Sequence, residues 1–127
     1  MSAYTPMNER RKHPRLESNI PVKICLEDGD IVTQTANISR SGAYCRVDKA
    51  INIMTKLKVH LLLPLKKDGK MATKKISCQG VVVRNEEIKG QNKYDIAIFF
   101  NDIGAKDADL IAEYISAYLE QEHSGTK

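Results

Sequence analysis

The middle of the chain, from residue 20 to residue 100, is a succession of short apolar and β-branched runs separated by turn-forming residues. The alternation is clearest at 56–63, where lysine or histidine occupies positions 56, 58 and 60 and apolar residues occupy the odd positions. A period of two is typical of a strand with one buried face. The pattern therefore predicts six strands, at residues 20–26, 30–38, 42–47, 56–63, 73–84 and 94–100.

Turn-forming residues lie between several of these predicted strands. Asp28-Gly29 and Asp68-Gly69 are dipeptides typical of two-residue hairpin turns. We expect Pro64 to end the fourth strand, and Gly80 is a candidate bulge or bend inside the fifth. Short strands joined in this way predict a mainly β domain, either a small antiparallel barrel or a sandwich. Closure into a barrel would leave no exposed sheet edge.

The apolar period changes near the C-terminus. Residues 106–122 predict one α-helix, because their apolar side chains fall on a single stripe at helical spacing. Asp107 and Asp109 lie in the first turn, where the helix macrodipole favours negative charge. The helix is acidic overall, whereas a helix that binds membrane surfaces or nucleic acid is basic. We expect the stripe to cover one end of the sheet through Leu110, Ile111, Tyr114, Ile115, Tyr118 and Leu119.

The first 19 residues show neither period. Prolines at positions 6 and 14 interrupt them, and a third follows at position 21. We therefore expect a single domain at 9–122, made of a flexible arm (9–19), a barrel (20–100) and the helix (106–122), between a disordered N-terminus (1–8) and a frayed tail (123–127). No apolar run approaches the ~18 residues that span a bilayer. The N-terminus also lacks the apolar core of a signal peptide. The sequence thus predicts a cytoplasmic protein that does not insert into membranes.

The composition, 42% hydrophobic and 28% charged, is ordinary for a globular domain. Cys25, Cys45 and Cys78 form no close pairs, and the three histidines are equally dispersed. Neither a disulfide framework nor a metal site is expected from such spacing, and reduced thiols that pack in strands are the simpler interpretation. No Ser–His–acid arrangement stands out, so the sequence predicts no catalytic residue, no cofactor and no enzyme.

The positive charge is concentrated near the N-terminus. The whole chain carries a net +4, and residues 8–16 alone hold four cations and one glutamate. Such a local cluster favours a small anion site over a broad basic face for duplex DNA. Arginine's planar guanidinium fits phosphate and the O6/N7 edge of guanine, and it can stack on a base. Taken alone, however, Arg10, Arg11 and Arg15 also fit a solvated tail.

A second polar segment, Asn-Ile-Ser-Arg-Ser-Gly-Ala at residues 37–43, lies at a predicted junction between two strands. Asn37 can present an amide oxygen to the N–H groups of a base, and Ser39 can donate to or accept from a base or phosphate. Gly42 provides either a positive φ or close approach of the backbone. The alternative is a structural turn, in which the asparagine and serine side chains bond their own backbone.

Together the two segments resemble the motifs of the PilZ domain family. Arg11 and Arg15 match its Arg-x-x-x-Arg motif, and 21 residues separate Arg15 from an [Asp/Asn]-x-Ser-x-x-Gly motif at 37–42. Residues 80–84 look like the long central strand of the family, and 94–100 look like its final strand. The resemblance runs from about Glu9 to Leu119. It implies a six-stranded antiparallel β-barrel of split-barrel type, with a C-terminal α-helix, that binds the bacterial second messenger cyclic di-GMP.

The resemblance also implies the roles of single residues. In the family the two arginines of the first motif contact phosphate and guanine, and the Asp or Asn of the second contacts a guanine. Many members have Asp where this chain has Asn37, which keeps an acceptor but loses a charge-assisted hydrogen bond, so we expect somewhat weaker binding. The residues predicted to bind cyclic di-GMP are Arg10, Arg11, Arg15, Asn37, Ser39 and Gly42.

The predicted function is that of a cyclic di-GMP receptor and adaptor. The arginine arm would close on the ligand and change the surface offered to an unidentified partner protein, regulating motility, surface polysaccharide or a related behaviour. Two alternatives stay open: a PilZ-like adaptor that binds no nucleotide, and a barrel that binds single-stranded nucleic acid. The second is less favoured because only 6% of residues are aromatic, and most Tyr and Phe fall in the last strand and the helix, where core packing is expected.

Overall fold

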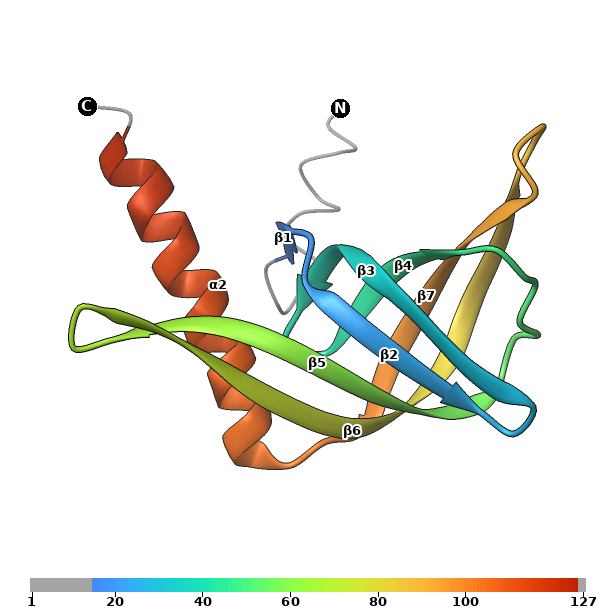
Figure 1. The fold of residues 1–127 in the computed structure, drawn as a ribbon, viewed down its shortest axis with the longest axis horizontal. Coiled ribbons are helices and arrows are strands. Elements are labelled where there is room, and N and C mark those ends of the chain that lie inside the picture. The colour runs from blue at the N-terminus through green and yellow to red at the C-terminus, as the bar shows by residue number, and fades with distance from the viewer. Residues whose placement is uncertain (1–14, 126–127) are drawn as a thin grey trace, which may run out of the picture.

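The computed structural model of the chain describes residues 15–125, which form seven strands and one helix (Figure 1). The strands are β1 (Arg15–Glu17), β2 (Pro21–Leu26), β3 (Gly29–Ser39), β4 (Gly42–Val47), β5 (Lys56–Lys67), β6 (Lys70–Ile88) and β7 (Lys93–Asp102), and the helix is α2 (Ala105–Gly125). The six strands predicted from the sequence correspond to β2 through β7. The additional strand, β1, lies inside the segment that was expected to be an arm.

The antiparallel strands close into a ring. They follow the order β1-β3-β2-β5-β6-β7-β4, and β4 also pairs with β3. Strands β2 to β7 thus form a six-stranded antiparallel barrel, as predicted, and β1 adds to β3 beyond the end of β2. From Asn37 to Ser39, β3 therefore has a paired strand on both sides, β1 and β4, so closure protects an edge that would otherwise be exposed.

Strands β5 and β6 are longer than the sequence pattern indicated, and the expectation that Pro64 ends β5 is wrong. Pro64 lies within β5, opposite Thr73 of β6. Pairing between β5 and β2 reaches only as far as Leu61, so Pro64 has a strand on one side alone. A proline is tolerated at such an edge because its missing N–H faces no partner. The hairpin then turns at Asp68 and Gly69, which both adopt positive φ, as the predicted two-residue turn requires.

Gly80 marks a bulge, as expected. The pairing of β6 with β7 shifts register between Gln79 and Val81. A Cβ on Gly80 would lie 2.5 Å from the Cγ2 atom of Ile98, so a larger residue would press into the neighbouring strand. The bulge lets β6 curve around the barrel, because an extra residue increases local bend and twist.

The core lies inside the ring, and α2 covers one end of it. Ile111, Tyr114 and Ile115 are buried, which confirms the predicted role of the first half of the helical stripe. Tyr118 and Leu119 are exposed instead, and Figure 1 shows the C-terminal part of α2 extending past the strands. The helix continues to Gly125, three residues beyond its expected end. No helix in residues 15–125 is long and apolar enough to cross a membrane.

Candidate ligand-binding site

Strand β1 brings the end of the arginine-rich segment to the second polar motif. In the register of β1 and β3, Arg15 lies opposite Ser39, and Glu17 lies opposite Asn37. Residues that are 20 to 24 positions apart in the sequence are thus direct neighbours. Arg10 and Arg11 lie outside the described residues, so the structure places Arg15 by its backbone and leaves those two arginines as predictions.

Thr35, which the sequence analysis did not single out, holds this segment in place. Its side chain is buried in the gap between β1 and β2. Its Oγ1 accepts a hydrogen bond from the Ile20 N–H at 3.0 Å and donates one to the Ser18 carbonyl at 2.5 Å. Its own N–H donates to the Ile20 carbonyl at 2.9 Å. A buried threonine with these bonds fixes where the chain leaves β1. Breaking the bonds would leave buried polar groups without hydrogen-bond partners, which costs free energy.

Ser39 is part of the turn between β3 and β4. Its side chain is only 1% exposed, and its Oγ accepts a hydrogen bond from the Ser41 N–H at 3.2 Å. The same hydroxyl lies 3.4 Å from the Gly42 carbonyl, to which it donates, and 3.3 Å from the Ser41 hydroxyl. In this structure Ser39 therefore shapes the turn, which is the structural role left open by the sequence.

Gly42 allows the backbones of β4 and β7 to approach each other closely. It pairs with Ser39 on one side and with Phe99 of β7 on the other. A Cβ at this position would overlap the carbonyl oxygen of Ile98. Gly42 does not adopt a positive φ, so close approach is the reason for glycine of the two that the sequence suggested.

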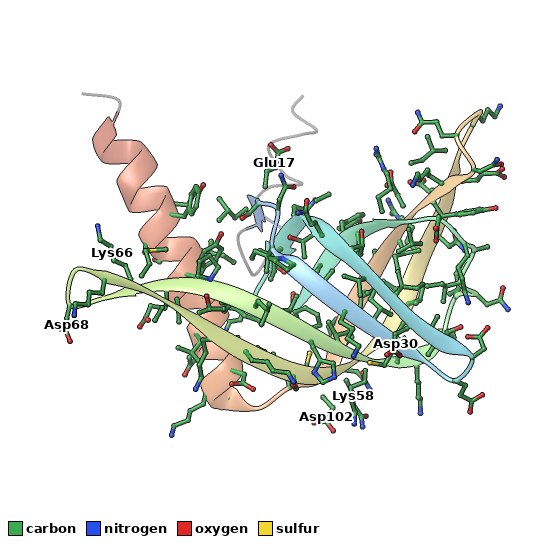
Figure 2. All side chains as sticks on the ribbon, viewed as in Figure 1. Glu17, Asp30, Lys58, Lys66, Asp68 and Asp102 are labelled. Atoms are coloured by element: carbon green, nitrogen blue, oxygen red, sulfur yellow. The ribbon has the colours of Figure 1, made fainter. Side chains whose placement is uncertain are left out.

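Asn37 sits in β3 between two strands. Glu17 of β1 is opposite it on one side and Tyr44 of β4 on the other, next to a register shift in β3. Its side chain is half-buried and is already engaged within the protein. Figure 2 labels Glu17, which is exposed at this end of the barrel. An aspartate at position 37 would face Glu17 as a like charge, which is unfavourable for residues directly opposite each other in a sheet.

A shallow hollow of about 190 Å³ lies beside the turn. Phe99 and Val83, which contribute to its lining, are 47% and 49% exposed. Aromatic rings and a guanidinium offer flat faces on which a base can stack. The expectation that aromatics of the last strand belong to the core thus holds for Phe100, which is buried, but is wrong for Phe99. The lining residues are Ser41, Gly42, Ala43, Tyr44, Val83, Arg84, Ala97, Ile98 and Phe99.

A signal for Phe99 was present in the sequence. The apolar run 96–100 must alternate between the two faces of a strand, so one of two adjacent phenylalanines has to point outward. The sequence gives no comparable signal that Arg84 lines the hollow. A register shift between Val82 and Arg84 interrupts the simple alternation of β6 side chains between the two faces of the sheet.

Both halves of the site are bonded to the C-terminal helix. Ser18, just after β1, has its Oγ 2.6 Å from the Tyr114 hydroxyl. Arg40, inside the β3–β4 turn, donates to Asp109 at 3.0 Å and forms an ion pair with it. Any rearrangement of β1 or of the turn would therefore change contacts that position α2.

The two buried cysteines, Cys45 and Cys78, are unreactive thiols. Burial raises the pKa of Cys45 to about 12, so its thiol stays protonated at neutral pH. Burial, aided by Asp107 and Asp102, likewise raises the pKa of Cys78 to about 12. Protonated thiols are poor nucleophiles and poor metal ligands. Residues 15–125 also contain no cluster of three or more His, Cys, Asp or Glu side chains that would hold a metal ion.

Comparison with known proteins identifies a matching family model and similar solved structures. A family model described as PilZ domain matches residues 9–117. Among solved structures, the chain is similar to the Bacillus subtilis inhibitor of motility, MotI/DgrA, with a TM-score of 0.75 and 24% sequence identity. That match covers 87% of this chain and 52% of the other, so this chain spans about half the length of its neighbour. A search of curated proteins found no match.

Proposed function

The chain belongs to the PilZ domain family, a family of cyclic di-GMP receptors, and from that membership we propose that it binds cyclic di-GMP at the corner formed by β1 and the β3–β4 turn. We call this region, made of Arg15–Glu17, Asn37–Gly42 and the hollow beside them, the ligand corner. The observation that carries the proposal is the register that sets Arg15 opposite Ser39. It brings one arginine of the first motif next to the second motif, although the two are separate in the sequence.

The chemistry of the corner suits an anionic guanine dinucleotide. Cyclic di-GMP carries two phosphate charges and two guanines. Arginines at the N-terminal side supply charge-assisted, bidentate hydrogen bonds to phosphate or to a guanine edge. Phe99 and Arg84 beside the turn offer faces for stacking. Asn37 supplies an amide at the boundary between β1 and β4.

The size of the hollow supports a role for the arm. Ligand pockets for small molecules typically enclose about 300–1,000 Å³, whereas the hollow beside Gly42 measures about 190 Å³. Residues 15–125 therefore provide a floor for the ligand, and the cover has to come from elsewhere. Arg11 of the first motif and its neighbour Arg10 lie four and five residues before Arg15, so closure of that segment over the ligand would complete the site.

The contacts with α2 suggest how binding is read out. Arg40 belongs to the ligand corner and Ser18 directly follows its β1 half. Arg40 contacts the helix through Asp109, and Ser18 contacts it through Tyr114. A ligand that reorganises either half would alter the position of α2 and thus the surface offered to a partner protein. The name of the structural neighbour, an inhibitor of motility, fits an adaptor that acts through such a partner.

Isothermal titration of the full chain with cyclic di-GMP tests the proposal. Arg11→Ala and Arg15→Ala should each weaken binding about tenfold to a hundredfold, since a hydrogen bond to a charged group contributes roughly 1.5–3 kcal/mol. Arg46→Ala is the matched control, because Arg46 is exposed and bonded to Asp95, away from the corner. The control should bind like the wild type, and all three variants should unfold at the wild-type temperature.

Other outcomes would overturn the proposal. Equal affinity of the wild type and both corner variants would exclude a role for the arginines. An absence of heat with the wild-type chain would favour the adaptor that binds no nucleotide. Tighter binding of a single-stranded oligonucleotide at the same corner, with a steep salt dependence, would favour the nucleic-acid alternative.

A further inference from the structure

The outer wall of the barrel carries a group of lysines far from the ligand corner. Strands β2, β5 and β6 run side by side there, and their outward residues alternate with the buried core. We call this surface the basic face and define it by its outward side chains. They are Pro21, Lys23, Val32, Lys58, His60, Leu62 and Lys75.

The pairing of the strands places these side chains next to one another. Lys23 of β2 lies opposite Val32 of β3 on one side and His60 of β5 on the other. One step along the sheet, Leu62 lies opposite Lys75 of β6. Neighbouring strands are about 4.8 Å apart, so the three lysines surround His60 within a single patch.

The positive charge of this patch acts on His60. Burial is the largest cause that lowers the pKa of His60, and repulsion from Lys75, Lys23 and Lys58 lowers it further, while Asp30 alone opposes them. His60 instead shares a hydrogen bond of 2.7 Å with Ser77 through Nδ1. More lysines than carboxylates therefore act on the pKa of the His60 ring.

Two acidic residues, Asp30 and Asp102, lie at the edges of the basic face. Asp30 forms an ion pair of 3.4 Å with Lys23, and both side chains are about half exposed. Asp102 of β7 pairs with Gln79 of β6, and Gln79 pairs in turn with Lys58 of β5. Figure 2 shows Lys58 and Asp102 at the lower edge of the barrel and Asp30 above them, beside β2. The described contacts leave Lys58 and Lys75 without an ion pair, so two cations remain available to a partner.

The centre of the basic face is apolar. Val32 is 78% exposed and Leu62 is 41% exposed, and both line a hollow of about 350 Å³ with Pro21 and Val22. An apolar centre within a charged rim is the usual anatomy of a protein–protein interface. Among the described residues that line this hollow, His60 is the one aromatic side chain, and none is Phe, Tyr or Trp, which disfavours the stacking platform of a single-stranded nucleic-acid site.

We propose that the basic face binds an acidic segment of a partner protein, whose apolar side chain packs on Val32 and Leu62 while its carboxylates pair with Lys58 and Lys75. Charge complementarity selects the partner, and the hollow sets the position of its apolar residue. The inference goes beyond the proposed function, because it names the chemistry of the partner and does not require that cyclic di-GMP binds.

The basic face is separate from the ligand corner. Strand β3 connects them, with Val32 near one end and Ser39 at the other. Seven residues along a strand span about 23 Å. The barrel can therefore hold the ligand and the acidic segment at the same time.

The test uses the full isotope-labelled chain and a short blocked peptide that alternates glutamate and leucine. Amide shifts in the NMR spectrum should map to residues of the basic face. K58E/K75E should reduce the affinity about tenfold or more, since both attractions become repulsions. K70E/K89E is the matched control, because it makes the same change of charge at exposed hairpin positions outside the face. It should keep its affinity within about twofold, because those two lysines do not line the hollow.

Several results would overturn the inference. The peptide could fail to bind, shift residues evenly over the surface, or bind both double variants equally. Stronger binding of this face to vesicles that contain phosphatidylserine would mean that its partner is an anionic membrane. Stronger binding to a single-stranded oligonucleotide would mean that its partner is a nucleic acid. Self-association that is lost in K58E/K75E would point to the acidic α2 of a second copy. Titration of K58E/K75E with cyclic di-GMP, expected to match the wild type, separates these failures from failure of the proposed function.

Discussion

The two ends of β3 are built in opposite ways. At its C-terminal end, the ligand corner depends on close contacts: Gly42 leaves no room for a side chain, and Ser39 and Thr35 are buried with their hydroxyls bonded. Near Val32, the basic face is made of side chains that project into solvent. Function and stability are therefore linked in the first region and largely independent in the second.

This difference has a practical meaning for mutagenesis. A change at Ser39 or Gly42 of the ligand corner alters packing along with any ligand contact, so loss of binding there has to be separated from loss of the fold. A change on the basic face alters charge at exposed positions, where substitutions usually shift stability by less than about 0.5 kcal/mol. The predictions below test this contrast.

The largest expected effect is that of Gly42→Ala. The added Cβ would overlap the Ile98 carbonyl, which belongs to the backbone of β7 and cannot rotate away. Forced overpacking of this kind costs typically 1–3 kcal/mol, and we expect about 3 kcal/mol or more for a backbone partner. Urea unfolding measures the loss.

Two controls accompany this variant. Gly104→Ala adds a Cβ that meets nothing within 4 Å, and it should cost at most about 1 kcal/mol as a change at the start of α2. K58E/K75E should change stability by less than about 0.5 kcal/mol. If Gly42→Ala were as stable as these controls, the ligand corner would be no more tightly packed than the basic face, and the contrast between them would fail.

The sequence predicted much of the barrel and less of the ligand corner. The alternation at Leu57, Val59 and Leu61 predicts one buried face regardless of what packs against it, and the Asp68-Gly69 turn is determined locally. The three-residue strand β1 has too few residues to show a period, and it forms because β3 extends past the end of β2. Such a long-range pairing leaves no local signal in the sequence.

The same distinction applies to the site residues. The motif that contains Asn37, Ser39 and Gly42 stands out by residue type. The sequence could not show, however, that the Ser39 hydroxyl is hydrogen-bonded within the β3–β4 turn. The role of Thr35 depends on the gap between β1 and β2, and the exposure of Arg84 to the hollow depends on a bulge. These features follow from the tertiary fold and become visible only with it.

An intermediate effect is expected at position 37, within the ligand corner. Asn37→Asp would place a second carboxylate opposite Glu17, and like charges directly opposite each other cost about 0.2–1 kcal/mol. Glu17→Gln combined with Asn37→Asp should recover this loss. Urea unfolding of the wild type, both single variants and the double variant forms the complete cycle.

The cycle also bears on ligand affinity. In the double variant the aspartate is free of its like-charged neighbour and can form the charge-assisted bond that asparagine lacks, so cyclic di-GMP should bind more tightly than to the wild type. A coupling energy of zero between positions 17 and 37 would contradict the explanation that Glu17 disfavours aspartate here. High salt should weaken the coupling, because the glutamate is exposed.

The smallest expected effect concerns His60 on the basic face. Burial and the neighbouring Lys75, Lys23 and Lys58 lower its pKa in the folded chain, against Asp30, whereas an unfolded chain has the ordinary value near 6.5. The unfolded state therefore takes up a proton more readily than the folded state. Stability that is present above about pH 6.5 is lost as the pH falls from there through the lowered folded value.

His60→Gln removes this contribution but keeps a polar side chain beside Ser77. The melting temperature of the wild type should fall between pH 7.5 and pH 5.5 by about one degree more than that of the variant, a small difference because solvent screens a partly exposed group. Binding of an acidic segment should act in the opposite direction, since carboxylates near Lys58 and Lys75 would raise the pKa of His60 towards its ordinary value. NMR titration of the His60 ring with and without the glutamate–leucine peptide measures that change. An unchanged titration curve in the presence of bound peptide would mean that the carboxylates do not approach the three lysines, and the basic face would then hold its partner by apolar contact alone.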